Sequence, residues 1–545
     1  MAQVPFRCNL SAASFPFVTE FGGRTVVIPQ YDQNFARQQN FSGADSDRDI
    51  GVPQAYYMHN CMPTAQGFQS IAYTKVLSGP VVMPVTDMDT MIPIKDPAEH
   101  KGYLGISKTG RAFIIKSGDG GWTEVTSQIA GWAGGQVSFA YANGFTYVDF
   151  KLFGVYKVDV VTRTLNPVTL TGLTGSLIHG VVASSNYLLA WDATTIYWSS
   201  ASNPEDFTPS LTTGAGSGTP QDINGTIIAV LQTASGFAAY TTTNIVIASY
   251  SGNVRYPWIF RQAPNSGGIA SIEHVTTDAD GGSNYAWTSS GILKIQPQGC
   301  TPVFPEATDF LAGRIFEDYD DATDVLTTQY LTEQLMIKMQ FVASRYLCIS
   351  YGISQLTHAL VYDIAMKRWG KLKLTHGDIF EVQNQMDDFI PWQGLYPNGW
   401  NVYVGVAWNS LLTSNDSAAS PKRTIGFLQP NGDIRIAVSD YGDESAAAVL
   451  MLGKYQLTRS QTTTFEQLDA ETVNEVNQNF DVLIRNSLNG KDLADPVSPY
   501  AMPVAIGSKT RQFFERVTGQ NFSVIFKGSF NLVSVEMFVS RGGRR

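Results

Sequence analysis

A repeated hairpin pattern between residues 190 and 295 is the feature that most constrains how this chain can fold. Three pieces align without gaps, and each has a small residue, an aromatic residue, four small or polar residues and then Ile. β-branched and aromatic residues favour pleated strands, whereas Asn and Gly tolerate the positive φ of a tight turn. Each piece therefore predicts a strand end, a turn and the start of the next strand. The pieces are residues 190–196, 239–245 and 286–292.

The spacing of these hairpins predicts the architecture. Their aromatic residues, Trp191, Tyr240 and Trp287, are 49 and 47 residues apart, and a weaker copy with Phe150 and Val155 begins 41 residues before Trp191. Such a period is what a propeller blade of about four strands needs. We therefore expect an all-β chain with a six- or seven-bladed β-propeller. Because the aromatics are periodic within blades, we expect them in the core rather than on a sugar-stacking platform.

The rest of the chain divides into three predicted regions. Residues 1–100 are expected to form an irregular, Pro-rich arm with short strands, because proline cannot donate to a sheet ladder. Residues 101–440 carry the propeller, with an acidic stretch at 317–321 interpreted as a connection between blades. Residues 441–545 are expected to form a C-terminal β domain resembling a sandwich.

One segment of the C-terminal region is ambiguous. Apolar side chains at Phe465, Leu468, Val473, Val476 and Phe480 have spacings that fit an amphipathic helix, although the flanking segments alternate as strands do. Both a helix and a strand stay open for residues 463–480. Period-two strands are predicted on either side, at 449–458, 480–485, 521–526 and 532–539.

Composition limits the classes of function. Hydrophobic residues make up 43% of the chain and aromatic residues 12%, enough for a sizeable core, and only 15% are charged against an average of about 25%. The net charge of −10 argues against tight binding to nucleic acid or to an anionic membrane. It is compatible with a lumen through which DNA slides, because a conduit should repel the phosphate backbone weakly.

The cysteines and the N-terminus indicate the compartment of synthesis. The four cysteines show no CxxC spacing, and no apolar run of signal-peptide type follows Met1. We expect reduced thiols in a protein made in the cytoplasm. No window approaches the roughly 20 apolar residues of a membrane span. The cysteines are Cys8, Cys61, Cys300 and Cys348.

No motif predicts catalysis, a cofactor or a metal. The histidines show no zinc spacing, and the sequence contains neither a GxxxxGK[ST] phosphate loop nor a GxSxG nucleophile elbow. We therefore expect no catalytic, cofactor-binding or metal-binding residues, and the chain is not expected to be an enzyme. The histidines are His59, His100, His179, His274, His358 and His376.

Three Asp- or Gly-rich segments are interpreted as turns. Residues 117–123 resemble the Asp-box of sialidase propellers, although Glu124 replaces its final aromatic, and even a perfect Asp-box is a structural turn. Residues 45–51 have the alternation of a calcium loop, but Ile50 and Tyr56 stand where an EF-hand needs Gly and Glu. The Asp residues at 278–281 are equally sufficient as a turn without a metal.

Three further segments carry a resemblance to a known family. Residues 57–68, with Asn60, Pro63 and Gly67, look like the Asn-x-x-Pro-x-x-x-Gly opening of phage tail propellers. Residues 198–207 are similar to a strand-exit motif of the same proteins, and residues 361–363 with Trp369 resemble their late VYD…W hairpin. The pattern covers about residues 50–440. The chain thus resembles the tail hub or tail nozzle (tail tubular) β-propeller proteins of short-tailed, podovirus-type bacteriophages.

This resemblance implies a structural protein of the virion. It implies a homo-hexamer below the portal and the tail adaptor, forming the distal DNA channel, holding tail fibres or spikes, and guiding or gating genome ejection. Viral DNA passes through such a channel without sequence-specific binding, and contact with the host envelope is compatible with the role. The protein is expected in the virion tail after synthesis in the host cytoplasm. The alternative is a carbohydrate-binding or sialidase-like adhesin that acts on host surface glycans through the propeller face.

Overall fold

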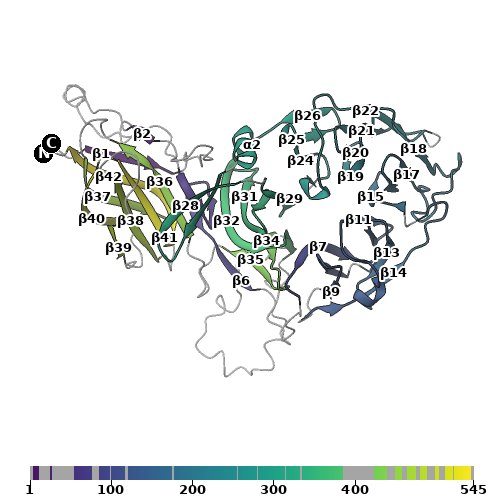
Figure 1. Ribbon diagram of the computed structural model, residues 1–545, viewed down its shortest axis with the longest axis horizontal. Helices are drawn as coiled ribbons and strands as arrows, with labels where there is room; N and C mark the ends of the chain where they lie inside the picture. Colours follow the sequence, from purple (N-terminus) through teal and green to yellow (C-terminus); the bar gives the residue numbers. More distant parts are fainter. Residues whose placement is uncertain are drawn as a thin grey trace, which may run out of the picture.

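The computed structural model contains a ring of sheets at one end and a smaller two-sheet body at the other (Figure 1). Inner strands from successive sheets lie side by side around the ring, as in a β-propeller. The structure describes residues 4–10, 25–27, 55–75, 85–98, 100–116, 121–174, 177–253, 256–278, 280–313, 315–331, 334–383, 423–438, 448–456, 463–473, 479–487, 497–502, 510–519 and 521–541.

The first sheets of the ring are each four-stranded and antiparallel, and each is built from consecutive strands. A short 3-10 helix, η2 (Thr126–Ile129), follows the first of them. The first sheet holds β7 (Met88–Lys95), β8 (Lys101–Ser107), β9 (Ala112–Lys116) and β10 (Thr123–Glu124). The second holds β11 (Val137–Ala142), β12 (Phe145–Phe150), β13 (Gly154–Asp159) and β14 (Thr164–Pro167).

The next three sheets repeat this arrangement. The third sheet holds β15 (Gly180–Ser184), β16 (Tyr187–Trp191), β17 (Ile196–Trp198) and β18 (Gly216–Gly218). The fourth holds β19 (Ile227–Thr233), β20 (Gly236–Thr241), β21 (Ile245–Tyr250) and β22 (Trp258–Gln262). The fifth holds β23 (Val275–Thr277), β24 (Asn284–Thr288), β25 (Gly291–Gln296) and β26 (Gly299–Pro302). The 3-10 helix η4 (Ile272–His274) precedes β23. The α-helix α2 (Pro305–Ala312) follows β26 and begins with Pro, whose fixed φ suits a first helical turn.

The predicted hairpins are confirmed by the register of the strands. Trp191 pairs with Ile196, Tyr240 with Ile245, and Trp287 with Ile292, each across the turn between the second and third strands of its sheet. Trp191 and Tyr240 are buried as expected, whereas Trp287 is partly buried and packs against a core. The aromatic residues of the repeat therefore pack between neighbouring sheets.

The ring closes with a strand from near the N-terminus. The four strands β29 (Met336–Val342), β30 (Tyr346–Gly352), β31 (Leu356–Asp363) and β32 (Arg368–His376) are followed by β33 (Asp378–Gln383), β34 (Arg423–Leu428) and β35 (Ile434–Val438). The fourth strand of that last sheet is β6 (Ala72–Lys75), which pairs with β35. Because the chain continues from β6 directly into the first sheet, this pairing ties the end of the ring to its beginning.

A buried ion pair joins the three sheets that meet at this closure. Lys338 Nζ lies 3.2 Å from Asp378 Oδ1 and donates to the carbonyl oxygen of Asp89 at 2.9 Å. Asp378 Oδ2 accepts from the backbone N–H of Met91 at 2.8 Å. These residues belong to β29, β33 and β7, so one polar cluster links the last sheets of the ring to the first.

The second body consists of two sheets around one apolar core, and we call it the sandwich. Its core includes Met58, Leu450, Leu468, Phe526 and Val535. One sheet contains β1 (Val4–Asn9), β5 (Phe68–Ser70), β37 (Thr463–Thr472), β40 (Thr510–Gly519) and β42 (Asn531–Arg541). The other contains β2 (Thr25–Val27), β3 (Ala55–His59), β36 (Ala448–Gln456), β38 (Asn479–Ser487), β39 (Val497–Met502) and β41 (Asn521–Ser529).

The N-terminal hundred residues differ from the arm that the sequence predicts. Strands β1, β2, β3 and β5 pair with C-terminal strands of the sandwich, whereas β6 and β7 belong to the ring. The expected boundary at residue 101 falls between β7 and β8, which pair along their length. Residues 45–51 and 117–120, which the sequence predicts to form turns, lie outside the described residues.

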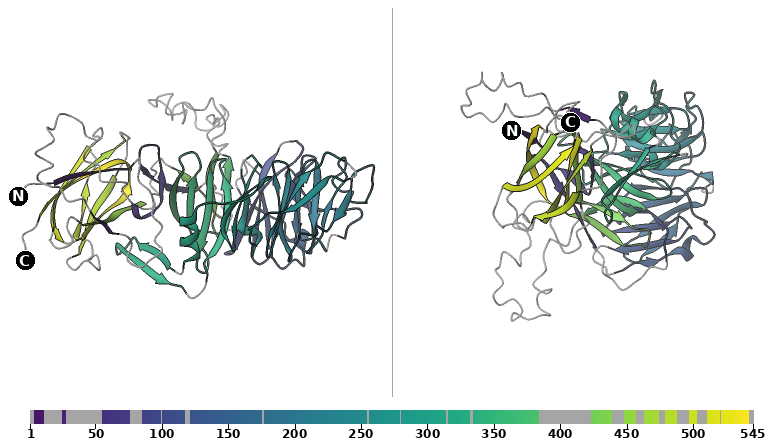
Figure 2. Two further views of the ribbon diagram at one scale, coloured as in Figure 1. Left: turned by 90° about the horizontal axis from the view of Figure 1, so that it is seen from above. Right: turned by 60° about the vertical axis from the view of Figure 1, so that its left-hand side comes forward.

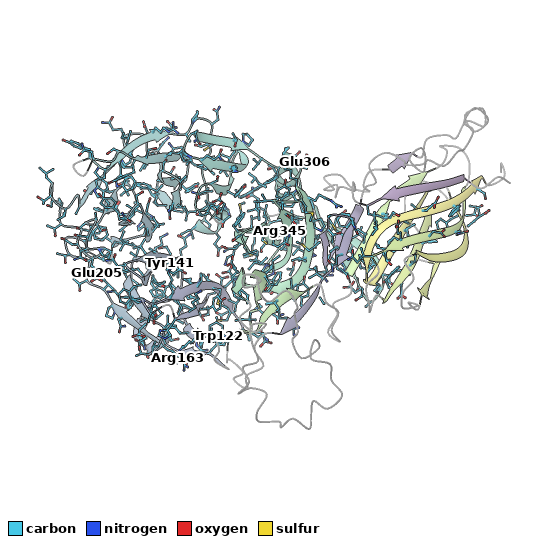
Figure 3. All side chains as sticks on the ribbon, turned by 180° about the vertical axis from the view of Figure 1, so that it is seen from behind. Trp122, Tyr141, Arg163, Glu205, Glu306 and Arg345 are labelled. Atoms are coloured by element: carbon cyan, nitrogen blue, oxygen red, sulfur yellow. The ribbon has the colours of Figure 1, made fainter. Side chains whose placement is uncertain are left out.

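A continuous sheet connects the two bodies. Strand β32 of the ring pairs with β4 (Cys61–Pro63), β4 pairs with β5, and β5 pairs with β42 of the sandwich. The hairpin of β27 (Ile315–Asp320) and β28 (Val325–Tyr330) also lies at this junction, on one side of the molecule (Figure 2). Seen from behind, Arg345 lies on the part of the ring next to the sandwich and Glu205 on the far side (Figure 3). Among the described residues, no helix is long and apolar enough to cross a membrane.

Candidate functional site

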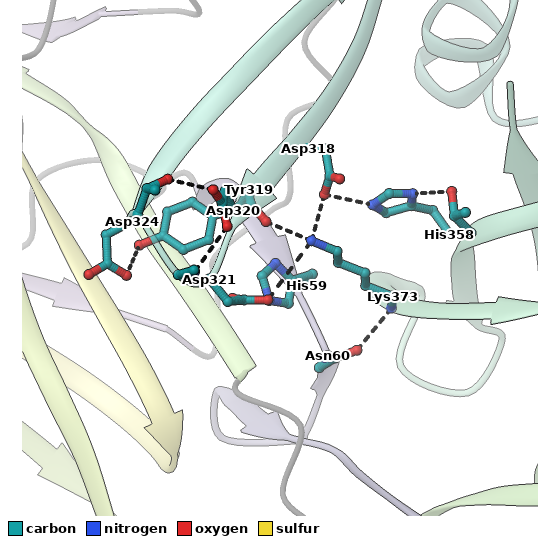
Figure 4. Close-up of polar contacts among 12 residues, drawn as sticks. His59, Asn60, Asp318, Tyr319, Asp320, Asp321, Asp324, His358 and Lys373 are labelled. Carbon is teal, nitrogen blue, oxygen red and sulfur yellow. Dashed lines mark hydrogen bonds and ion pairs between the residues drawn. The ribbon is translucent and has the colours of Figure 1, made fainter.

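The hairpin β27–β28 forms the centre of a polar cluster at the junction of ring and sandwich (Figure 4). Its two strands pair only with each other, so the hairpin is a sheet of its own. Phe316 packs in the ring core near α2, whereas Tyr319 packs in a core made by sandwich strands, with Met451 and Ile525. The hairpin therefore bridges two hydrophobic cores that belong to different bodies.

Acidic side chains of the hairpin face basic groups of the ring. Asp318 Oδ1 lies 2.7 Å from Lys373 Nζ and 3.5 Å from His358 Nε2. Lys373 also donates from Nζ to the carbonyl oxygen of Tyr319 at 2.6 Å. Lys373 lies on β32 and His358 on β31, so this side of the hairpin is fixed to the ring.

The tip of the hairpin faces groups of the sandwich. Asp321 Oδ1 lies 3.2 Å from Nε2 of His59, which is fully buried on β3. Lys527, on β41, donates from Nζ to Asp324 Oδ1 and to the carbonyl oxygen of Asp321, both at 2.6 Å. Tyr319 Oη donates to the same Asp324 oxygen at 3.1 Å. The tip is thus held by two strands of the sandwich.

A buried lysine lies beneath the hairpin. Lys371 is 2% exposed, and its Nζ lies 4.4 Å from the ring centroid of Tyr57 and 6.0 Å from that of Tyr351. Burial lowers the pKa of Lys371 to about 8, and the neighbouring Glu317 and Asp318 carboxylates oppose that shift. Tyr57 Oη accepts from the backbone N–H of Tyr319 at 3.2 Å. Cation–π contacts therefore help to hold this charge, which has little access to water.

The electrostatics of the cluster favour neutral histidines and ionised carboxylates. Burial lowers the pKa of His358 to about 3 and also lowers the pKa of His59, even though Asp318 and Asp321 pull in the opposite direction. Partial burial would raise the pKa values of Asp318 and Asp321. Hydrogen bonds from His358 and Lys373 to Asp318, and from His59 to Asp321, outweigh it and lower both values.

A pocket of about 440 Å³ opens at the base of the hairpin. Its wall combines hydroxyl and amide side chains with three apolar ones and the ion pair of Asp318 and Lys373. It is lined by Phe316, Asp318, Ile353, Ser354, Gln355, Thr357, His358, Lys373, Leu374 and Thr375. Because the charged groups at its base already pair with one another, the arrangement suits mechanical coupling better than acid–base chemistry.

The other residues considered in the sequence have local structural roles. His376 Nε2 lies 2.8 Å from Ser350 Oγ in the ring core, and His100 Nδ1 lies 2.9 Å from Asp96 Oδ2. Asp278 Oδ1 accepts from the backbone N–H of Gly282 at 2.8 Å, as the turn interpretation predicts. Within the described part of the chain, no group of three or more His, Cys, Asp or Glu side chains is placed to hold a metal ion.

Sequence reasoning missed the hairpin itself. The stretch 317–321 was interpreted as a connection, but residues 315–320 form strand β27. Phe316 and Tyr319 are buried on either side of Asp318, whereas Asp320 is exposed. Aromatic residues within an acidic segment were the available signal, because a solvated connection has no need to bury them.

In structure, the chain has a distant similarity to known β-propellers. No protein-family model matches the sequence. No curated protein matches it either.

Three solved structures illustrate the structural likeness. The WD40 β-propeller domain of Doa1 has 10% identity and a TM-score of 0.37, over 68% of this chain and 98% of that one. YCF48 bound to D1 peptide has 11% identity and a TM-score of 0.37 over the same shares. The extracellular domain of the putative hybrid two-component system BT4673 from B. thetaiotaomicron has 9% identity and a TM-score of 0.41, over 91% of this chain and 64% of that one. At these values, nothing about function is transferred.

Proposed function

We propose that this chain is a structural subunit of a phage tail, a nozzle or hub protein that assembles with copies of itself into a ring around the DNA channel. The proposal extends the sequence resemblance, which implies a homo-hexamer attached to the tail adaptor. The subunit acts by position rather than by chemistry: it carries load between neighbours and guides or gates the genome as it leaves.

The observation that carries the proposal is the way the two bodies are joined. Residues 57–68, which hold the first family-like motif, form the end of β3, all of β4 and the first residue of β5 at the junction. Arg368 of the ring donates from its guanidinium to the carbonyl oxygens of Leu10, at 2.8 Å, and of Thr64, at 2.9 Å. A subunit whose bodies are linked by a shared sheet and buried polar contacts is suited to transmit force within an assembly.

The arrangement of sheets supports a propeller of seven blades. Six four-stranded sheets and the β29–β32 portion of a larger sheet make seven such units in the described part of the chain. Their first strands contact one another from β11 through β15, β19, β23 and β29 to β33, and β33 contacts β7. A closed ring protects the inner edges of its sheets and leaves the outer faces and the sandwich for contacts between subunits.

The charge of the chain agrees with a conduit. A net charge of −10 over 545 residues leaves little driving force for binding phosphates, whose neutralisation needs clustered Lys and Arg. Multiplied over the copies of a ring, this charge favours a channel that lets DNA pass without holding it.

The test is assembly. The full chain is purified and its mass measured by analytical ultracentrifugation, alone and with the tail adaptor from the same phage, and the complex is imaged by electron microscopy. We expect a ring with the adaptor bound at one end. A chain that stays monomeric with the adaptor present refutes the proposal. Binding or hydrolysis of glycans by the isolated chain, with normal virion assembly in its absence, favours the adhesin instead.

A further inference from the structure

The junction between ring and sandwich has one fixed side and one side held by the hairpin. On the fixed side, the connecting sheet is narrow: Lys371 pairs with Cys61, and only Asn531 and Leu532 pair with β5. Few backbone hydrogen bonds therefore cross from one body to the other by this route. A narrow sheet of this kind can bend if nothing braces it.

The hairpin provides that brace through side-chain packing, ion pairs and hydrogen bonds between its backbone and neighbouring side chains. It shares no ladder with either body, and it is held by the packing of Phe316 and Tyr319 and by ion pairs at Asp318, Asp321 and Asp324. Contacts of this kind are lost together when a short element lifts away, whereas the ring sheets keep their own hydrogen bonds.

We propose that β27–β28 is an acid-sensitive strap: protonation of His59 and His358 releases the hairpin and lets the sandwich hinge on the ring about the β32–β4–β5–β42 sheet. This inference concerns motion within one chain, and it stands whether or not the chain forms a tail nozzle.

The direction of the pH effect follows from the environment of the two histidines. In the docked state both are buried and neutral, with pKa values below the ordinary value of about 6.5. When the hairpin lifts, both imidazoles gain access to water and take up protons at their ordinary pKa. The free-energy difference that favours the docked over the released hairpin is therefore largest above about pH 6.5 and decreases as the pH falls.

Two lysines near each histidine act in the same direction as burial, whereas one carboxylate of the hairpin opposes them. Asp321 of the hairpin, Tyr57 of β3, and Lys371 and Lys373 of β32 face His59. The two lysines lower its pKa, so they disfavour a second positive charge in the docked state.

His358 has a similar environment. Asp318 of the hairpin, Tyr351 of β30, and Lys371 and Lys373 face it, and again the lysines lower its pKa. At the tip, Lys527 faces both Asp324 and Asp481 of β38. The lowered pKa values of Asp318 and Asp321 mean that acid below about pH 4 weakens docking further.

The size of the effect can be worked out from proton uptake. A histidine that is neutral when docked and has a pKa of about 6.5 when free shifts the open-to-docked ratio about tenfold between pH 7.5 and pH 5.5. His358, with a docked-state pKa of about 3, meets this condition, and a second histidine that also meets it raises the shift to at most about 100-fold.

Hydrogen exchange of the full chain tests this inference. Amide exchange, corrected for intrinsic rates, is measured by mass spectrometry at pH 7.5 and pH 5.5 for peptides covering 315–330 and, as an internal reference, 346–363. We expect exchange of the hairpin to rise by about 10- to 100-fold while β30 and β31 keep their protection. An unchanged hairpin overturns the inference, as does an equal rise in both peptides, because that indicates general unfolding.

A pair of variants assigns the effect to the two histidines. The double variant H59Q/H358Q keeps amide groups that can donate to Asp321 and Asp318, and we expect it to lose the pH response of the hairpin. The matched control H179Q/H274Q removes two histidines whose pKa values are also lowered by burial but which lie outside the junction. A full response in H59Q/H358Q refutes the assignment. If that variant does not fold, the wild-type comparison of the two peptides still decides.

Discussion

Asp149 occupies a position that should make the whole ring sensitive to pH. In the other sheets the residue that pairs across the turn with Ile196, Ile245 or Ile292 is aromatic, whereas the corresponding partner of Val155 is Asp149. Asp149 is fully buried, and neither of its carboxylate oxygens has a hydrogen-bond partner among the described residues. The carboxyl group therefore lies in a slot that the repeat fills with an aromatic side chain.

Burial raises the pKa of Asp149 well above its usual range, and Lys151 only partly opposes the shift. In the unfolded chain the same carboxyl ionises near pH 3.9. Its contribution to stability is thus complete below that pH and is lost as the pH rises toward the folded-state pKa. In this window the folded state binds one proton more than the unfolded state, so the free energy of unfolding falls by about 1.4 kcal/mol per pH unit.

The substitution D149N removes the ionisable group and keeps the shape. We expect the two proteins to have similar stability near pH 4 and the variant to gain about 1.4 kcal/mol over the wild type between pH 5 and pH 6. Urea unfolding followed by tryptophan fluorescence at a series of pH values measures the difference. The matched control is D159N on the adjacent strand. Asp159 accepts from the backbone N–H groups of Val161 and Thr162, and these bonds lower its pKa.

For D159N the difference from the wild type should be flat between pH 5 and pH 6, because both states ionise below that range. Parallel stability curves for D149N and the wild type would refute the reasoning. They would mean that Asp149 is ionised in the folded ring and that its slot is not apolar.

Two further predictions concern packing and the ring closure. W191A should lose about 3–5 kcal/mol of stability, because the indole is buried between two sheets. G180A should also destabilise the protein, because its Cβ would collide with the Trp191 ring. The loss should be much smaller in the W191A background, as a double-mutant cycle in urea would report. D378N should cost about 3 kcal/mol or more, because it leaves the buried Lys338 ammonium without its nearest carboxylate. A free energy of unfolding for D378N within about 0.5 kcal/mol of the wild-type value would show that the pair does not hold the closure together.

The repeat of the ring could be read from the sequence because its signals are local. Each aligned piece spans one turn, and the residues that pair across it lie five apart in all three, as Tyr240 and Ile245 do. The weaker copy was placed one residue out of phase: Phe150 pairs with Gly154, and Asp149 pairs with Val155. A positive φ at Leu152 and at Gly154 accommodates a longer turn there, and an acidic residue in the aromatic position hid the true alignment.

The ambiguous segment shows how a local irregularity misleads a periodicity argument. Residues 463–472 form strand β37, and residues 479–487 form β38. The register of β37 shifts between Phe465 and Gln467, on both of its neighbours. A β-bulge adds one residue to the strand, so the side chains after it point to the opposite face from the one that strict alternation predicts. Phe465 and Leu468 are therefore both buried although they are three residues apart. That spacing imitates a helix.

The junction could not be predicted because its parts are distant in sequence. Strand β1 pairs with β42 from Val4 to Asn9, opposite residues 534–539, and no short-range pattern specifies a partner more than 500 residues away. Likewise, nothing near Asp318 and Asp321 in the sequence indicates that they contact His358 and His59. A run of acidic residues is ordinarily a solvated segment, and only the folded chain brings it against buried histidines and lysines.

The same distance explains why the junction is where regulation would be built. Packing within the first five sheets of the ring is set by neighbours in sequence, so each of them can form and break as one cooperative unit. The hairpin is different, because its stability depends on His59 from the N-terminal part of the chain and on Lys527 from the C-terminal part. Ion pairs between partly buried groups respond strongly to protonation, whereas apolar sheets do not. A fall in pH below about 6.5 therefore weakens the contacts that hold ring and sandwich in one orientation, whereas within the ring it protonates Asp149 and adds stability.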